Sequence, residues 1–249
     1  MERMRASTGK AKRARALITV FLAGCIVASA CGSDGGTPHA KPSDRVTIRG
    51  RATLDGAPLS ADFLGAVVRA DGLITPCQAD IPSVTGGSYG IRVLAQAAGS
   101  GCGRRGAEVL LWTFVGGTKI FSTSAIGWPP RNAAQFDVQF SSAMPRGDAP
   151  AVTELSGEVF DQAGRRLPPG TRVEAYVGAT RCGVASVRQA DDTFTGYILS
   201  VVGPDSIGGC TQGAPITFRI NGQPAIETSV NDLGPPPSGS GGSFRLTQS

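Results

Sequence analysis

Apolar and polar residues alternate with a period of two in several short stretches of this chain. In 216–220, two isoleucines and a phenylalanine are separated by single polar residues, which is typical of a strand that buries one face. Asn221 and Gly222 follow at once and predict a tight hairpin turn, with the returning strand at 225–230. No stretch after residue 30 has the apolar spacing of an amphipathic helix. We therefore expect an all-β protein.

The same pattern occurs about 107 residues earlier in the chain. Alternating apolar residues at 109–111 lead into a Gly-Gly turn at 116–117 and a returning strand around Ile120. The spacing from tyrosine to cysteine is 13 residues in both places, from Tyr89 to Cys102 and from Tyr197 to Cys210. The chain is therefore expected to contain two tandem copies of one β domain.

The predicted boundaries are a first β-sandwich domain at 45–142, a linker at 143–151 and a second domain at 152–249. Each copy is of a normal size for an independent core. Each offers about seven short strands between Gly, Pro, Asp and Asn turns, which favours an Ig-like β-sandwich.

The beginning of the chain indicates export. Residues 1–15 carry six basic residues and one acidic residue, and an apolar run follows at 16–30. A basic segment before a short apolar run is typical of a bacterial signal peptide and is too short for a spanning helix. We expect residues 1–30 to be a lipoprotein signal peptide and residues 31–44 to be a flexible tether.

Two cysteines are candidates for lipidation. Residues 22–25, Leu-Ala-Gly-Cys, resemble the lipobox of bacterial lipoproteins and give the stronger local match, at Cys25. The looser match at Cys31 leaves an even number of cysteines, and a polar glycine-rich stretch follows it directly. Cys31 is our first choice and Cys25 the alternative, while 28–30 also suits ordinary signal cleavage. Lipidation would anchor the protein to the outer face of the cell membrane or in the periplasm.

The net charge of +5 comes from the leader. Without residues 1–30 the chain has 24 − 6 = 18 basic and 19 − 1 = 18 acidic residues. A nucleic-acid interface needs a clustered surplus of lysine and arginine, so we expect no nucleic-acid partner.

Four cysteines remain, one pair in each copy. Of the three possible pairings, only Cys77–Cys102 with Cys182–Cys210 respects the duplication, and we predict these two intradomain disulfides. The only histidine, His39, lies in the tether, and no cysteine pair has close CxxC spacing, so we expect no metal site and no cofactor.

Three stretches of the second copy carry a family resemblance: 157–161, 167–175 and 191–199. Their order resembles the carboxypeptidase regulatory-like family, with its Gly-x-Val strand, Pro-Gly strand start and Asp-Gly-x-Tyr turn. The resemblance covers about the first half of each copy and is weaker in the first, as at 59–62. It implies a prealbumin-like sandwich that serves as a non-catalytic spacer, adhesion or binding module, and it carries over no active-site residues.

Few residues suggest chemistry. We do not expect a Ser-His-Asp or Cys-His site, because the only imidazole, His39, lies in the flexible tether, where no neighbouring groups would hold it. Asp191-Asp192 could be an acid pair or part of a calcium site, but an acidic turn is the plainer interpretation, since calcium takes six or more oxygens. Trp112 and Trp128 are candidate platforms for sugars, and the competing interpretation is packing against loop prolines or between the domains.

The sequence therefore predicts a non-catalytic, lipid-anchored extracytoplasmic protein that displays two sandwich domains for binding or adhesion at the cell envelope. Its partner would be an envelope protein or a glycan. The alternatives are a structural spacer or accessory subunit of an envelope complex and, less favoured, an exported hydrolase that uses carboxylates. A fold alone does not separate these functions.

Overall fold

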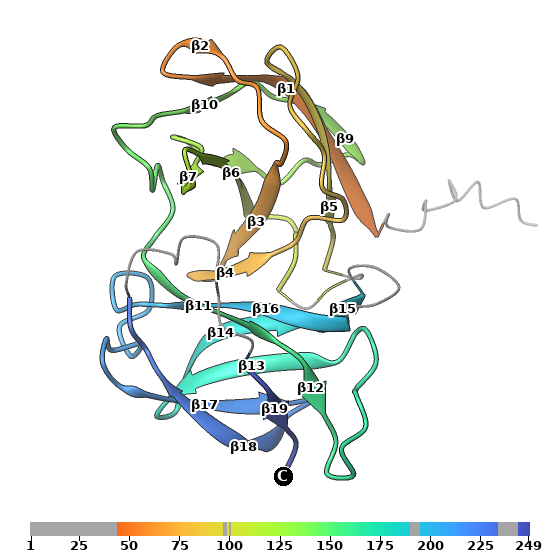
Figure 1. The fold of residues 1–249 in the computed structure, drawn as a ribbon, viewed down its shortest axis with the longest axis vertical. Helices are drawn as coiled ribbons and strands as arrows, with labels where there is room; N and C mark the ends of the chain where they lie inside the picture. The colour runs from red at the N-terminus through yellow and green to blue at the C-terminus, as the bar shows by residue number, and fades with distance from the viewer. Residues whose placement is uncertain (1–43, 97–98, 100, 190–194, 234–243) are drawn as a thin grey trace, which may run out of the picture. The chain divides into compact units, whose positions relative to one another are not determined.

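The computed structural model describes residues 44–96, 99, 101–189, 195–233 and 244–249 (Figure 1). Every regular element in these ranges is a β-strand, which confirms the all-β prediction. The signal peptide, both candidate lipidation cysteines and Asp191-Asp192 lie outside the described residues. Within the described ranges, no helix has the length and apolar character needed to span a membrane.

The first half of the chain forms two facing sheets. In one, β1 pairs with four neighbours: β1 (Arg45–Leu54), β2 (Ala57–Pro58), β5 (Ser88–Leu94), β9 (Ala133–Gln135) and β10 (Val138–Phe140). The other has the order β4-β3-β6-β7, with β8 beside β6: β3 (Gly65–Ala70), β4 (Leu73–Pro76), β6 (Glu108–Val115), β7 (Thr118–Phe121) and β8 (Ile126–Gly127).

The second half repeats this arrangement. Its larger sheet has the order β14-β13-β17-β18: β13 (Arg172–Val177), β14 (Thr180–Ser186), β17 (Pro215–Ile220) and β18 (Gln223–Val230). The facing strands form a three-stranded sheet of order β11-β16-β15 and a two-stranded sheet β12-β19: β11 (Val152–Gly157), β12 (Val159–Phe160), β15 (Arg188–Gln189), β16 (Thr195–Val202) and β19 (Leu246–Thr247).

Strand register shows that the two halves are copies. Gly50 lies opposite Tyr89, as Gly157 lies opposite Tyr197. The predicted hairpin is present, with Asn221 at a φ of 50° and Gly222 at 84°. These positive values explain the residue types in the turn.

Both predicted disulfides are confirmed. Cys77 is bonded to Cys102 and Cys182 to Cys210, each with a Cα–Cα distance of 5.6 Å. In the first half the bond joins the residue after β4 to the loop before β6, and in the second half it joins β14 to the loop before β17. The two disulfides therefore lie at equivalent positions of the two halves.

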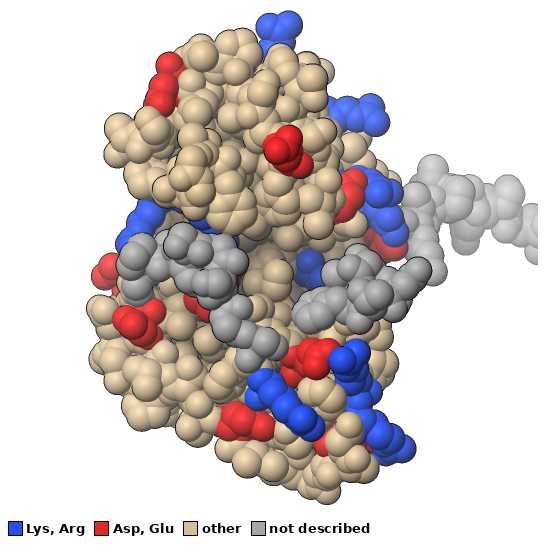
Figure 2. Space-filling view, viewed as in Figure 1, with Lys and Arg blue, Asp and Glu red and all other residues tan. Residues whose placement is uncertain are grey.

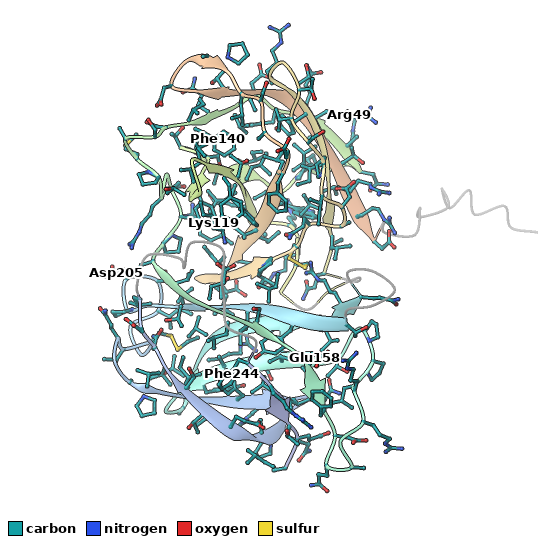
Figure 3. All side chains as sticks on the ribbon, viewed as in Figure 1. Arg49, Lys119, Phe140, Glu158, Asp205 and Phe244 are labelled. Carbon is teal, nitrogen blue, oxygen red and sulfur yellow. A yellow bond between two sulfur atoms is a disulfide. The ribbon has the colours of Figure 1, made fainter. Side chains whose placement is uncertain are left out.

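In each half, a tyrosine hydroxyl holds the edge of the sandwich by a hydrogen bond to a backbone carbonyl. The Tyr89 hydroxyl donates a hydrogen bond to the carbonyl oxygen of Phe136 at 2.7 Å, and Tyr197 donates to Phe244 at 3.0 Å. The glycine opposite each tyrosine is required because a Cβ atom there would collide with that same carbonyl. In Figure 3, Phe244 lies within the second half.

The two halves differ in what covers the outer face of one sheet, which is the sheet of β6 in the first half and the sheet of β17 in the second. On β6, Val109 and Leu111 point into the core of the first half, whereas Leu110 points into a core that also contains second-half residues. The sheet containing β6 is therefore buried on both faces, and its strands are almost continuously apolar, as expected for such sheets.

In the second half, the corresponding outer face is polar. Thr217 and Arg219 on β17 are exposed, and the Arg219 guanidinium lies 4.7 Å from the centre of the Tyr176 ring. Glu174, almost fully buried, accepts hydrogen bonds from Arg172 at 2.6 Å and Arg181 at 3.1 Å. Along β13 and β17 this face is stabilised by its own charge pairs, whereas Val184 on β14, opposite Glu174, is buried in the core that includes first-half residues.

The junction between the halves forms where β4 lies against β14 and β16 (Figure 1). The Thr75 hydroxyl donates to the carbonyl oxygen of Val184 at 3.1 Å, and Lys119 Nζ donates to both carboxylate oxygens of Glu154 at 3.0 and 2.9 Å. All described residues belong to one compact unit. The domain boundaries at 142 and 152 stay a prediction.

Candidate functional site

A cleft opens at the junction, between the chain that follows β4 and the strands β15 and β16. Its volume is about 440 Å³, within the range of small-molecule pockets. Residues that define its chemistry come from both halves: Gln78, Asp80 and Ile81 from the first, and Arg188 and Ile198 from the second. The cleft therefore exists only because the two halves pack together.

Arg188 supplies the positive charge of this cleft. Its Nη1 donates to the carbonyl oxygen of Gln78 at 3.2 Å, and its Nη2 donates to the carbonyl oxygen of Pro76 and to Cys102 Sγ, the latter at 3.4 Å. Burial lowers the pKa of Arg188 to about 10, so the guanidinium stays protonated at neutral pH. Among the described residues no carboxylate forms an ion pair with it.

Gln78 adds a polar atom without a partner. Its Oε1 is buried and has no hydrogen-bond partner among the described residues. A buried polar group without a partner costs about 1–3 kcal/mol, so a ligand atom that satisfied it would gain affinity. The nearby carboxylate of Asp80 is already engaged by Arg92 at 2.7 Å.

Two exposed isoleucines give the cleft an apolar rim. Ile81 is 65% exposed and Ile198 is 43% exposed, which is high for side chains of this size. Ile198 alternates on β16 with Tyr197, whose ring faces the second core. The outer face of β16 thus supplies one wall of the cleft.

A second, smaller cleft of about 260 Å³ lies near Arg104, Arg172 and Arg181. Arg104 is paired with Asp71, and Arg172 and Arg181 share the single carboxylate of Glu174. On the face seen in Figure 2, basic and acidic side chains are likewise interspersed. The smaller cleft lies below the usual volume range of small-molecule pockets, about 300–1,000 Å³, whereas the larger one lies within it, so the larger cleft is the better candidate for binding.

Trp112 lines neither of these clefts. Its ring lies against Gly65, where a Cβ atom would collide with it, and Lys119 Nζ lies 4.2 Å from the ring centre. Sequence alternation placed Trp112 on a face expected to be exposed, but that face is covered by the second half, and the indole is partly buried. Its Nε1 is buried without a described acceptor.

Trp128 is packed in the first half. Its ring occupies the space where a Cβ atom on Gly103 would stand, and it lies against the first core. The structure does not bring Trp112 and Trp128 into one site. Their role as sugar platforms stays a prediction.

The described residues contain no group of three or more histidine, cysteine, aspartate or glutamate side chains arranged to hold a metal. His39 and Asp191-Asp192, the other candidates for chemistry, lie outside the described residues. What the described geometry offers is a cleft with an arginine that no described carboxylate pairs with, a carboxylate already bonded to Arg92, and an apolar rim.

Sequence reasoning missed Gln78, Ile81, Arg188 and Ile198. A signal for the junction was nevertheless present. The stretch 109–112 is Val-Leu-Leu-Trp, whereas the matching stretch 216–219 is Ile-Thr-Phe-Arg. An apolar run in one copy, where the other copy alternates, indicates a strand covered on both faces.

The fold is a tandem β-sandwich with one disulfide within each half and a cleft at the junction of the halves. No family model matches the chain, and no curated protein matches it. Among solved structures, it is similar to a streptococcal ancillary pilin, with 6% sequence identity over 84% of this chain and 64% of that one and a TM-score of 0.25. The chain thus spans less than two thirds of that pilin.

The shaft pilin SpaA from Lactobacillus rhamnosus GG is a second similar structure. Its sequence identity is 7% over 82% of this chain and 97% of that one, with a TM-score of 0.22. A double mutant of the same pilin gives 9% identity over 82% and 96%, also with a TM-score of 0.22. At TM-scores this low we draw no argument from the likeness.

Proposed function

We propose that this protein is an exported, non-catalytic binding protein, anchored through a lipid on Cys31, with Cys25 as the alternative. It displays its two sandwich halves on the outer face of the cell membrane or in the periplasm, and it holds its ligand in the cleft at the junction. The observation that carries the proposal is the charge of Arg188, which pairs with no carboxylate among the described residues, inside a cleft built by both halves.

Two features support export. The chain begins with a basic segment and an apolar run of signal-peptide type. Both disulfides expected in the exported part are formed, and such bonds persist in oxidising compartments. Lipid anchoring rests on the sequence around Cys31 and Cys25 alone.

A spacer or accessory subunit is the second candidate, favoured by the junction itself. The buried Lys119–Glu154 pair and the apolar cover of β6 hold the halves as one unit, as a spacer requires. A spacer does not need an open cleft with an arginine that no described carboxylate pairs with, so we rank it second. A hydrolase has no comparable support, since the described carboxylates nearest the cleft are paired with arginine.

Export and anchoring are tested by producing the tagged full chain in a bacterium that is fed an alkyne-labelled fatty acid. We expect label on the membrane-bound protein, loss of label in Cys31→Ser and retention in Cys25→Ser. The reverse pattern would move the anchor to Cys25. Unlabelled protein that stays inside the cell in both variants would overturn the proposal.

Binding is tested by crosslinking on intact cells. We expect the wild-type protein to capture a ligand or partner, and Ile198→Arg, which fills the cleft from an exposed position, to lose it. The control is Ile226→Arg, since Ile226 is 67% exposed on β18 and lies outside the cleft. Equal capture by both variants would favour the spacer function.

A further inference from the structure

We propose that the cleft at the junction binds a small organic carboxylate, whose oxygens pair with Arg188 and whose apolar part covers Ile81 and Ile198. This inference rests on the binding function proposed above. It adds the chemical class of the ligand, and the argument has three steps: the charge, the polar neighbour and the apolar rim.

Arg188 has hydrogen-bonding capacity left over. A guanidinium carries five N–H donors, and three have described acceptors, namely two carbonyl oxygens and a disulfide sulfur. All three acceptors are neutral, so they satisfy donors without cancelling the charge. A charge removed from water without a counter-ion is costly. An anion in the cleft would therefore be stabilised by both the charge and the remaining donors.

The surroundings favour a single negative charge. Arg188 is the one described cation of the lining and pairs with no described carboxylate, while Asp80, also in the lining, is negatively charged and bonded to Arg92. A phosphate dianion would gain one cation and face the Asp80 carboxylate. A carboxylate carries one charge spread over two oxygens, and guanidinium groups bind it with strong, charge-assisted hydrogen bonds.

Gln78 supplies the second polar contact. Its side-chain amide is buried at the Oε1 position without a described partner. The two ends of a glutamine amide differ only by a flip about the last torsion. Turned one way the amide accepts from a ligand N–H, and turned the other way it donates to the carboxylate. Gln78 and Arg188 both line the cleft, and the Gln78 backbone oxygen accepts from Arg188.

The rim determines the rest of the ligand. Ile81 and Ile198 are exposed, and Pro76 and Ala79 extend the apolar lining. Covering these side chains would gain about 25 cal/mol for each Å² of apolar surface removed from water. A volume of about 440 Å³ holds more than a carboxylate group alone, so the ligand should carry an apolar body of several carbons.

The test compares three probes of equal length and different charge: hexanoate, hexanamide and hexylammonium. The full chain is placed in lipid nanodiscs, with empty nanodiscs as the blank, and binding is followed by ligand-observed NMR and calorimetry. We expect hexanoate to bind at least tenfold more tightly than hexanamide, and hexylammonium to show no saturable binding. Equal affinity for hexanoate and hexanamide, or no binding of hexanoate, would overturn the inference.

Variants locate the effect. Arg188→Gln removes the charge and should bring the affinity for hexanoate down to that for hexanamide. Ile198→Ser should weaken both probes by the same factor. The control is Arg165→Gln, because the Arg165 side chain is 81% exposed and lies outside the cleft, and it should change neither affinity. Unchanged hexanoate binding in Arg188→Gln would also overturn the inference.

Two features of the experiment keep the binding result interpretable when a variant does not fold or a probe does not bind. Arg188 also holds backbone carbonyls of the first half, so Arg188→Gln could fail to fold. The probe comparison on wild-type protein and the exposed Ile198→Ser variant then decide the outcome alone. Failure of the carboxylate to bind, in a protein that is exported and still captures a partner through the cleft, refutes only the ligand class. A protein that is neither exported nor able to capture a partner refutes the proposed function itself.

Discussion

The hydrogen bond from each tyrosine to its facing loop gives a prediction with a magnitude. Tyr89→Phe and Tyr197→Phe remove a single hydroxyl and keep the buried ring. Each leaves the carbonyl oxygen of Phe136 or Phe244 without its partner at 2.7 or 3.0 Å. A lost hydrogen bond costs about 0.5–1.5 kcal/mol, and a buried group left unsatisfied about 1–3 kcal/mol. We therefore expect each variant to lower the free energy of unfolding by about 1–2 kcal/mol.

Urea unfolding of the detergent-solubilised full chain, with the disulfides intact, measures this difference. The expected result is a lower midpoint with an unchanged denaturant slope, because the surface exposed on unfolding stays the same. Tyr176→Phe is the matched control, since no described hydrogen bond involves its hydroxyl. A loss in Tyr176→Phe as large as in the other two, or no loss in either of them, would refute the locking role.

The same tyrosines predict a dependence on alkaline pH. Burial raises the pKa of Tyr89, with a smaller effect from Asp137, and burial followed by Glu227 raises the pKa of Tyr197. A phenol whose pKa is raised by folding contributes its full stability below the ordinary value of about 10 and loses it as the pH rises further. Unfolding should therefore become easier above about pH 10, and less steeply so in the Tyr→Phe variants.

Three further substitutions test the packing, each by the same urea unfolding. Leu110→Asp should lower the free energy of unfolding by at least about 3 kcal/mol, because it buries an unpaired carboxylate at the junction. Thr217→Asp, at the matching but exposed position, should lower it by less than about 0.5 kcal/mol. Similar losses in the two variants would show that β6 is not covered. Gly50→Ala should prevent folding or lower stability severely, because its Cβ atom would collide with the Phe136 carbonyl. Gly127→Ala has open space around its Cβ atom and should be tolerated. A stable Gly50→Ala protein would contradict the close contact beside the Tyr89 hydrogen bond. Lys119→Met should lower the free energy of unfolding by about 1–3 kcal/mol, because the Glu154 carboxylate loses its partner. The Lys119 side chain is only 8% exposed. No loss would show that this ion pair does not stabilise the junction.

The elements and the disulfides could be predicted because local patterns determine them. Alternation identified β17, Asn221-Gly222 identified its turn, and the repeat left only one pairing of four cysteines that respects it. These inferences need only the order of residues along one copy. The duplication then applied each of them twice.

The cleft could not be predicted because it depends on how two copies meet. Alternation separates the two faces of a strand but does not say what covers the outer face. Trp112 was for that reason expected on an open face, although the second half covers it. Arg188 looks like an ordinary strand residue until the chain following β4 is placed beside it. Only the apolar run at 109–112 pointed to the junction in advance.

The polar residues on the outer faces of β13 and β17 make the two halves of the chain unequal. Tyr176, Thr217 and Arg219 occupy the positions that Val67, Leu110 and Trp112 hold in the first half. Exchanging the order of the repeats would expose Leu110 and bury Arg219 at the junction. The two halves are therefore not interchangeable, and their order along the chain determines which outer strand face is covered.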